Sequence, residues 1–208
     1  MSDSYIEKTA TFVKETLKND PTGHDWWHVH RVWQMALSIA EKEEADQEVV
    51  SLIALLHDIA DHKFHDGNQE LAAKVSREWL ESIDAPAETI ERVVAGVDAC
   101  SFSKGKAAPN LEAAIVQDAD RLDALGTIGI ARTFATGSSL GIPMYQPEKP
   151  KDDQATAVGH FYDKILKLKE GMNTQAAKEL AEVRHQKVVA FLDDFYEEWS
   201  ILESKNKI

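Results

Sequence analysis

The stretch from Val49 to Ile59 constrains the fold more than any other part of this chain, because it is almost entirely apolar and yet contains His57 and Asp58. A helix this apolar is buried on most of its sides. An isolated charge is very costly in such surroundings, so the two polar side chains must either pair with each other or bind a metal ion. The residues of this segment alone leave both alternatives open.

The rest of the chain has the pattern of an all-α protein. Apolar residues recur at helical spacing, Pro, Gly, Asn and Asp separate the periodic segments, and no segment alternates convincingly like a strand. The expected helices cover residues 4–18, 25–44, 47–62, 68–83, 88–100, 111–125, 126–134, 160–169 and 174–203. The longest irregular stretch, 136–154, is either a lid over a site or a plain surface loop.

Length and charge limit the class of protein. The 208 residues predict a single domain over 1–208, with a core at about 23–125 and C-terminal helices over 155–203 that pack on it. The formal charge of −13 argues against binding of long nucleic acids, which requires a basic face. A small phosphorylated ligand is still compatible with this charge, because a local cationic pocket or a divalent cation can outweigh it.

The sequence also predicts where the protein is found. Cys100 is the single cysteine, which excludes an intrachain disulfide and fits a reducing compartment. The N-terminal residues lack the pattern of a signal peptide, and the apolar stretches are far shorter than the roughly 20 residues that span a bilayer. We therefore expect a cytoplasmic protein with no membrane association.

Histidines and carboxylates on three expected helices provide a candidate metal site. Its members are His28, the pair His57 and Asp58, and Asp118. Two nitrogen and two oxygen ligands would leave part of an octahedral shell open for water and substrate, as metal-dependent hydrolysis requires. This mixture of ligands suits Mn, Fe or Co and leaves Zn or Mg possible. On residue types alone, a buried His–Asp pair without metal remains the alternative.

Three further side chains could serve such a site. Asp61 follows His57 by four residues and Asp58 by three, so we expect it to share a helix face with them and to accept a proton from an attacking water. Its alternative role is a solvated acid at a helix end. Arg31 and Arg121 each follow a candidate ligand by one turn, and each could contact a phosphate or form an ion pair.

The order His28, His57–Asp58 and Asp118 resembles the defining pattern of the HD-domain metal-dependent phosphohydrolases. Longer motifs resemble a bacterial subgroup of about this length: HDWWHVHRV at 24–32, LLHDIAD at 55–61, SFSKG at 101–105, QDADRLDALG at 117–126, HFYDKILKL at 160–168 and AEVRH at 181–185. The resemblance covers roughly residues 23–199. The subgroup includes nucleotide pyrophosphohydrolases, which release pyrophosphate from nucleoside triphosphates and commonly favour manganese.

The resemblance implies an all-α, single-domain HD-domain fold with the metal site between central helices. It implies that His28, His57, Asp58 and Asp118 ligate the metal and that Asp58 and Asp61 are the catalytic acids, although several family members have Glu at the position of Asp61. HD enzymes with two or three metals place extra histidines near 98–100, and this sequence has none there. We therefore expect one divalent ion, with Mn favoured over Mg, Co, Fe, Ni or Zn.

The expected reaction is hydrolysis of a nucleoside (deoxy)triphosphate to monophosphate and pyrophosphate. Anionic phosphates need cationic or hydrogen-bonding partners, and the candidates are His24, Arg31, Lys63, Lys104, Arg121 and Lys151. The alternatives are a nucleoside 5′-monophosphatase of the same fold and a metal- or nucleotide-binding sensor without turnover. The expected partner is a small phosphorylated substrate, and a homodimer is compatible with the sequence.

Overall fold

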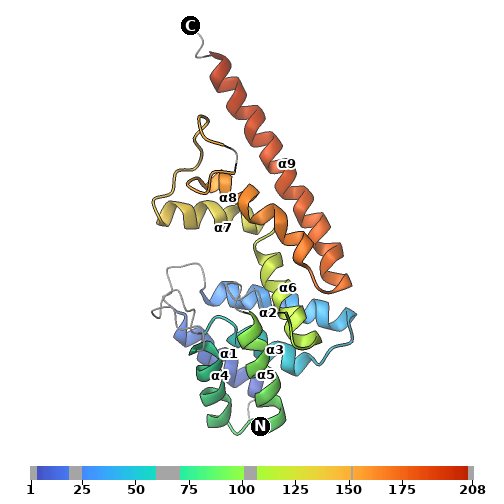
Figure 1. The fold of residues 1–208 in the computed structure, drawn as a ribbon. Coiled ribbons are helices and arrows are strands. Elements are labelled where there is room, and N and C mark those ends of the chain that lie inside the picture. Colours follow the sequence, from blue (N-terminus) through green and yellow to red (C-terminus); the bar gives the residue numbers. More distant parts are fainter. Residues whose placement is uncertain (1–3, 19–24, 60–70, 101–106, 151, 206–208) are drawn as a thin grey trace. The chain divides into compact units, whose positions relative to one another are not determined.

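The computed structural model describes residues 4–18, 25–59, 71–100, 107–150 and 152–205. Within these ranges the chain forms helices and no strand (Figure 1), which confirms the predicted all-α fold. The elements are α1 (Tyr5–Thr16), α2 (Trp26–Lys42), α3 (Gln47–Leu56), α4 (Leu71–Ser82), α5 (Ala87–Cys100), α6 (Leu111–Asp123), α7 (Gly126–Ser139), α8 (Ala157–Asp163), the 3-10 helix η3 (Ile165–Gly171) and α9 (Gln175–Lys205).

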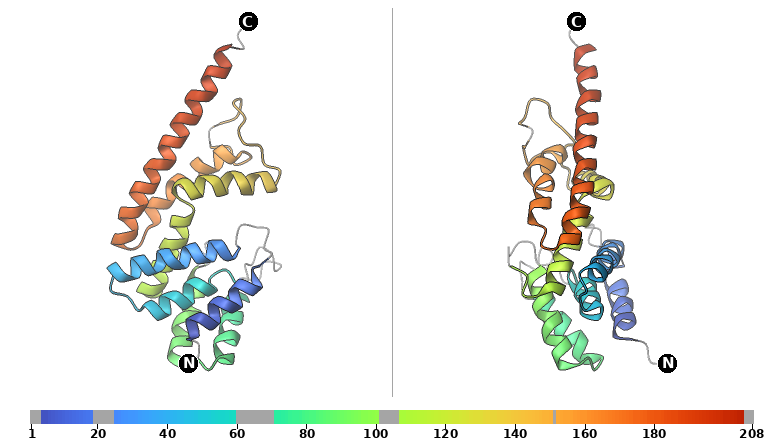
Figure 2. Two further views of the ribbon diagram at one scale, coloured as in Figure 1. Left: turned by 180° about the vertical axis from the view of Figure 1, so that it is seen from behind. Right: turned by 90° about the vertical axis from the view of Figure 1, so that its right-hand side faces the viewer.

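The chain divides into two compact units. The first unit comprises Met1–Asp120 together with Asn173–Ala177, and the second comprises Arg121–Met172 with Lys178–Ile208. The first unit is therefore discontinuous: the chain leaves it within α6 and returns at the start of α9 (Figure 2). The expectation of a single domain over 1–208 remains a prediction.

Helix α3 is the centre of the first unit. Every residue from Val49 to Leu56 is buried, as expected for such an apolar segment. Helices α1, α2 and α5 all contact α3, and Gly96 of α5 allows the closest approach, because a Cβ at that position would lie 2.4 Å from Cδ1 of Ile53. Each fully buried Val, Leu or Ile contributes roughly 1.5–3 kcal/mol to folding. Packing on three sides thus holds α3 in place, and with it His57 at the C-terminal end of the helix.

Helix α3 ends earlier than the sequence predicts. The expected helix over 47–62 stops at Leu56, and His57 is its C-cap residue. Residues up to Ile59 form a turn, in which the amide of Ile59 donates to the carbonyl of Leu56 at 3.2 Å. His57 and Asp58 therefore lie at the end of a buried helix instead of within one.

The second unit has an aromatic core. Phe161 of α8 is fully buried, and its ring lies 5.8 Å from that of Phe134 and 6.0 Å from that of Phe191. Tyr145, in the irregular stretch after α7, packs edge-on against Trp199 of α9, with 4.9 Å between ring centroids. The irregular stretch begins later than predicted because α7 continues to Ser139, and the tyrosine holds part of it against α9.

The turn between α6 and α7 explains part of the sequence motif around residue 184. Gly126 has a φ of 78°, a value that favours glycine, and a Cβ there would lie 3.2 Å from Cγ of Arg184. The guanidinium of Arg184 donates to the carbonyl of Leu122, and burial lowers the pKa of this arginine from its usual value. Arg184 therefore supports this turn within the second unit.

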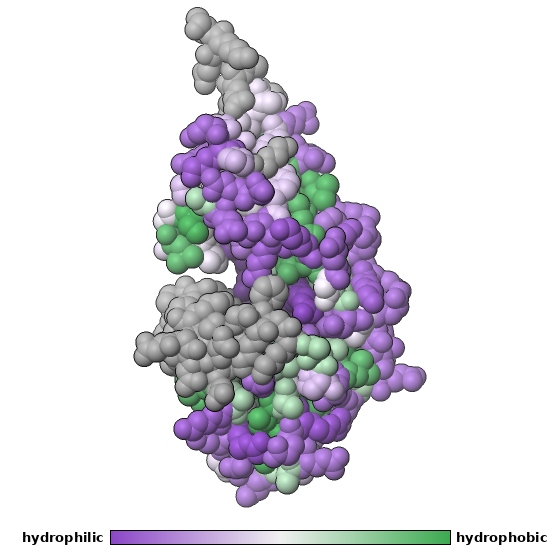
Figure 3. Space-filling model, viewed as in Figure 1, coloured by the Kyte–Doolittle hydropathy of each residue, from purple (hydrophilic) through white to green (hydrophobic). Residues whose placement is uncertain are grey.

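The described surface is mainly polar. On the face drawn in Figure 3, hydrophilic residues cover most of the area that is not grey, and hydrophobic residues form small patches. Among the described helices, none has the length and apolar character needed to cross a membrane.

Candidate metal centre

Helix α2 places His28 through the capping of its first turn. Asp25 is the N-cap residue, and its carboxylate accepts a hydrogen bond of 2.9 Å from the backbone amide of His28. Such caps satisfy one of the unpaired amides at a helix start and define where the helix begins. His28 itself is fully buried. The local sequence thus fixes the imidazole in the first turn of α2.

The end of α3 places His57 in a comparable way. Its Nδ1 lies 2.7 Å from the carbonyl oxygen of Ala54, one of the last carbonyls of the helix. A carbonyl can only accept, so Nδ1 carries the proton and donates it. Nε2 is then the ring atom that a metal ion could bind, which is the arrangement common to histidine metal ligands.

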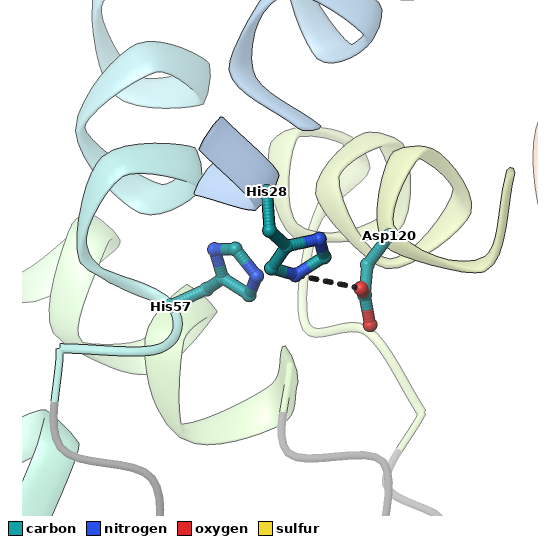
Figure 4. Close-up of side chains that lie close together, drawn as sticks. All are labelled: His28, His57 and Asp120. Carbon is teal, nitrogen blue, oxygen red and sulfur yellow. Dashed lines mark ion pairs between the residues drawn. The ribbon is translucent and has the colours of Figure 1, made fainter. Parts of the chain in front are cut away.

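The side chains of His28, His57 and Asp120 converge from α2, the end of α3 and α6 (Figure 4). Their three candidate ligand atoms lie within 4.8 Å of one another. Asp58 is also close: its Oδ2 lies 3.2 Å from Nε2 of His28 and 3.4 Å from Nε2 of His57. Nε2 of His28 lies 3.5 Å from Oδ1 of Asp120. His28, His57 and Asp120 therefore converge, and Asp58 lies beside both imidazoles.

The arrangement at His57 calls for a cation. Within the described residues, its Nε2 is buried and forms no hydrogen bond, although a carboxylate oxygen of Asp58 is 3.4 Å away. The lone pairs of a neutral imidazole and a carboxylate repel each other unless a proton or a metal ion lies between them. Nearby His28 and Asp120 supply further ligand atoms at the same point, which fits a divalent ion.

Burial and charge at this cluster also fit a metal centre. His28 and His57 are 0% and 7% exposed, whereas the side chains of Asp58 and Asp120 are 17% and 31% exposed. The imidazoles thus form the inner wall, and the carboxylates border the side that solvent reaches. Two neutral imidazoles and two carboxylates carry a charge of about −2, which would balance one divalent cation. An open side of this kind is what a hydrolytic metal site needs for substrate.

Asp118 is not among the side chains that converge here. Asp118 is fully buried on α6, and its carboxylate oxygens accept hydrogen bonds from Asn173 and Thr174. Asp120, which the sequence analysis did not select, lies close to His28 instead. The motif itself contained the signal that could have found Asp120. Residues two positions apart on a helix, such as Asp118 and Asp120, point to nearly opposite sides. Only one of the two aspartates could face His28.

The other predicted site residues divide into two groups. Arg31 and Arg121 are half-buried on α2 and α6. The remaining five lie outside the described residues: His24, Asp61, Lys63, Lys104 and Lys151. The helical spacing from which a shared face of His57 and Asp61 was predicted does not apply, because α3 ends at Leu56.

The helical fold and this His–Asp cluster define a class that sequence comparison identifies. The HD domain family matches residues 26–125, which span α2 to α6 and include the four clustered side chains. Together with the relatives described next, this match shows that the chain belongs to the HD-domain family. The predicted resemblance is confirmed, and at the level of the family the chain is an HD-superfamily hydrolase, a metal-dependent phosphohydrolase.

Particular relatives extend the similarity over nearly the whole chain. YpgQ of Bacillus subtilis is 39% identical over 190 residues, which are 89% of either protein. An HD-superfamily hydrolase from Bacillus thuringiensis is 44% identical, with a TM-score of 0.79 over 94% of this chain and 96% of that one. A crystal structure of Bacillus subtilis YpgQ in complex with ADP has the same TM-score of 0.79 at 35% identity, over 93% of this chain and 97% of that one.

Proposed function

We propose that this protein hydrolyses nucleoside triphosphates to monophosphates and pyrophosphate with one divalent metal ion, Mn before the others, held by His28, His57, Asp58 and Asp120. The observation that carries the proposal is the convergence of His28, His57 and Asp120, whose candidate ligand atoms lie within 4.8 Å of one another. A divalent ion at this point would be bound by imidazole nitrogen and carboxylate oxygen together.

The relatives support a nucleotide as the substrate. YpgQ of Bacillus subtilis crystallised with ADP, and its structure matches 93% of the present chain. A free nucleotide is also compatible with the formal charge of −13, which disfavours nucleic-acid polymers. The release of pyrophosphate specifically rests on the resemblance of the sequence motifs to nucleotide pyrophosphohydrolases.

The residues of the chain have distinct tasks in this proposal. A divalent ion in such a site supplies Lewis-acid chemistry at phosphorus. Asp58 and Asp120 provide the negative charge that retains the ion and border the open side where a phosphate would enter. Asp61 remains our proposed acceptor for the proton of the attacking water.

Binding of the phosphates is proposed for cationic and polar side chains near the motifs. Arg31 and Arg121 each follow a metal-site segment in the sequence, and an arginine can contact two phosphate oxygens at once. The further candidates for phosphate binding remain His24, Lys63, Lys104 and Lys151.

The test is a panel of nucleoside mono-, di- and triphosphates with Mn, Mg, Co or Zn, in which pyrophosphate and orthophosphate are measured separately. We expect pyrophosphate and monophosphate from triphosphates, and no turnover after removal of metal by a chelator. Asp58→Ala should lose both bound metal and turnover. Asp194→Ala removes an exposed carboxylate from α9 and should behave like the wild type.

Three outcomes would contradict the proposal. Orthophosphate from monophosphates, with triphosphates left intact, would identify a 5′-monophosphatase. Retention of nucleotide without any product, with every metal, would identify a sensor. Turnover by fully metal-free protein would exclude the metal centre itself.

A further inference from the structure

Asp118 has a hydrogen-bonding pattern unlike that of a metal ligand. Its Oδ1 accepts from the backbone amide of Asn173 at 2.8 Å and from Nδ2 of the same residue at 2.9 Å. Its Oδ2 accepts from the backbone amide and from the hydroxyl of Thr174, both at 2.8 Å. These four donors belong to two consecutive residues. Hydrogen bonds to a buried carboxylate are among the stronger ones in proteins, so this contact holds the segment tightly.

The segment that Asp118 holds is the start of α9. Thr174 directly precedes the helix, and its hydroxyl oxygen also accepts from the amide of Ala177 at 3.3 Å. The backbone amide of Ala176, also in the first turn of α9, donates to the carboxylate of Glu43 at 2.8 Å. Carboxylates at a helix N-terminus are favourable because of the partial positive charge there. This part of α9 thereby belongs to the first unit although it follows α6 by some 50 residues in the chain.

Gln117 of α6 connects the same segment to α5 through two hydrogen bonds. Nδ2 of Asn173 donates to Oε1 of Gln117 at 3.2 Å, and Nε2 of Gln117 donates to the carbonyl of Ala99 at 2.7 Å. Gln117 and Asp118 are buried neighbours on α6. Helix α6 is thus held through two neighbouring side chains that point in different directions.

Asp120 lies on the other side of the same helix turn. Successive residues of an α-helix are turned by about 100°, so Asp118 and Asp120 point about 200° apart. The first faces the start of α9, and the second lies 3.5 Å from Nε2 of His28. We propose that Asp118 is a positioning residue: by binding the start of α9 it fixes the rotation of α6 that presents Asp120 to the metal.

This inference rests on the proposed metal centre, and it assigns to Asp118 a role that differs from ligation. A ligand contributes an oxygen to the metal, whereas a positioning residue acts through its partners. Removal of a partner of Asp118 must therefore weaken metal binding even though every proposed ligand is still present. Thr174 is the suitable partner, because its side chain can be changed while every residue of α6 is kept.

The experiment measures the affinity and stoichiometry of Mn²⁺ binding by calorimetry on the full chain. Thr174→Val should weaken binding about tenfold at an unchanged stoichiometry of one, because it removes a hydrogen bond to a charged group. Thr174→Ser keeps the hydroxyl and should bind like the wild type. Ser76→Ala removes another buried hydroxyl of the first unit, which bonds to the carbonyl of Ala72, and should leave the affinity unchanged.

Asp118→Asn and Asp120→Asn complete the comparison. Asp118→Asn should bind one Mn²⁺ more weakly and should speed amide hydrogen exchange at Thr174, while Asp120→Asn should abolish Mn²⁺ binding with exchange at Thr174 unchanged. Loss of the bound ion in Asp118→Asn together with wild-type affinity in Thr174→Val would overturn the inference and make Asp118 a ligand. A wild-type protein that binds no Mn²⁺ would instead refute the proposed metal centre.

Discussion

His57 combines two tasks in one imidazole. Its Nδ1 donates to the carbonyl of Ala54 and so satisfies an acceptor at the end of α3, where a helix has no amide left to pair with. The same bond leaves Nε2 as the ring atom that a metal ion can bind. The hydrogen bond that ends the helix therefore also orients the ring of His57 for the proposed metal.

Replacement of this side chain tests the assignment. His57→Ala removes a ligand together with the bond to Ala54, so we expect Mn²⁺ affinity to fall at least about 100-fold and stability to fall by about 1 kcal/mol. Calorimetric titration and urea unfolding measure the two effects. His185→Ala, a change of the same kind in the second unit, is the control for affinity. Wild-type Mn²⁺ binding by His57→Ala would contradict the assignment.

His160 of α8 provides a prediction about pH. Burial lowers its pKa, the charge of Lys164 lowers it further, and Asp163 opposes the change in part. The folded protein thus binds this proton less readily than the unfolded chain. The contribution of His160 to the free energy of unfolding is therefore fully present above the ordinary histidine pKa of about 6.5, and it is lost as the pH falls towards the lower pKa of the folded state. Burial also lowers the pKa of His185, which adds to the slope in the same direction.

The measurement compares urea unfolding of the wild type and His160→Gln between pH 7.5 and about pH 5. We expect the wild type to lose more stability than the variant over this range, because glutamine does not titrate. Equal losses in the two proteins would mean that His160 is protonated as easily in the fold as in the unfolded chain.

At the scale of helices, the ends matter more to the site than the middles. His28 is in the first turn of α2 and His57 is the C-cap of α3. The capping residue Asp25 should therefore affect both stability and metal binding. We expect Asp25→Ala to lower the free energy of unfolding by about 1 kcal/mol, with weaker Mn²⁺ binding because the first turn frays.

Asp25→Ser is the matched control, since serine accepts the same hydrogen bond from the amide of His28. Urea unfolding and Mn²⁺ titration of both variants provide the test. If the alanine variant lost stability with no change in affinity, the cap would serve the helix alone.

The helices themselves were largely predictable from the sequence, because apolar periodicity and capping residues are local signals. The starts of α2 and α3 follow from Asp25 and Asp46, whose carboxylates accept from amides of the first turn. The end of α3 was not predictable in this way. His57 and Asp58 continue an apolar run whose pattern predicts helix, yet in the structure α3 ends at Leu56 and the imidazole of His57 pairs with the carbonyl of Ala54.

The candidate site was predictable in its residue types and less so in its members. His28, His57 and Asp58 come together as the sequence suggested, whereas the choice between Asp118 and Asp120 depends on which face of α6 meets α2. Asn173 and Thr174, over 50 residues away in the chain, bind Asp118 and so determine which face of α6 carries Asp120 towards His28. No local pattern in the sequence contains this information.

At the scale of the whole molecule, the four proposed ligands all belong to the first unit, which the chain builds from two separate stretches. A ligand that binds only the folded protein stabilises it by mass action, by about 2.7 kcal/mol when its concentration is 100 times the dissociation constant. Mn²⁺ should therefore raise the melting temperature of the wild type in a concentration-dependent way, and it should have no effect on Asp120→Ala.

Hydrogen exchange can locate this stabilisation in the chain. We expect Mn²⁺ to slow amide exchange in α2, α3 and α6 and, in addition, in Asn173–Ala177, because Asp118 connects that segment to the helix that carries Asp120. The distant segment is the informative one, since it contains no proposed ligand. Protection confined to the turns that hold His28, His57 and Asp120 would mean that metal binding acts only locally, and that the start of α9 is attached to the first unit without sensing its metal.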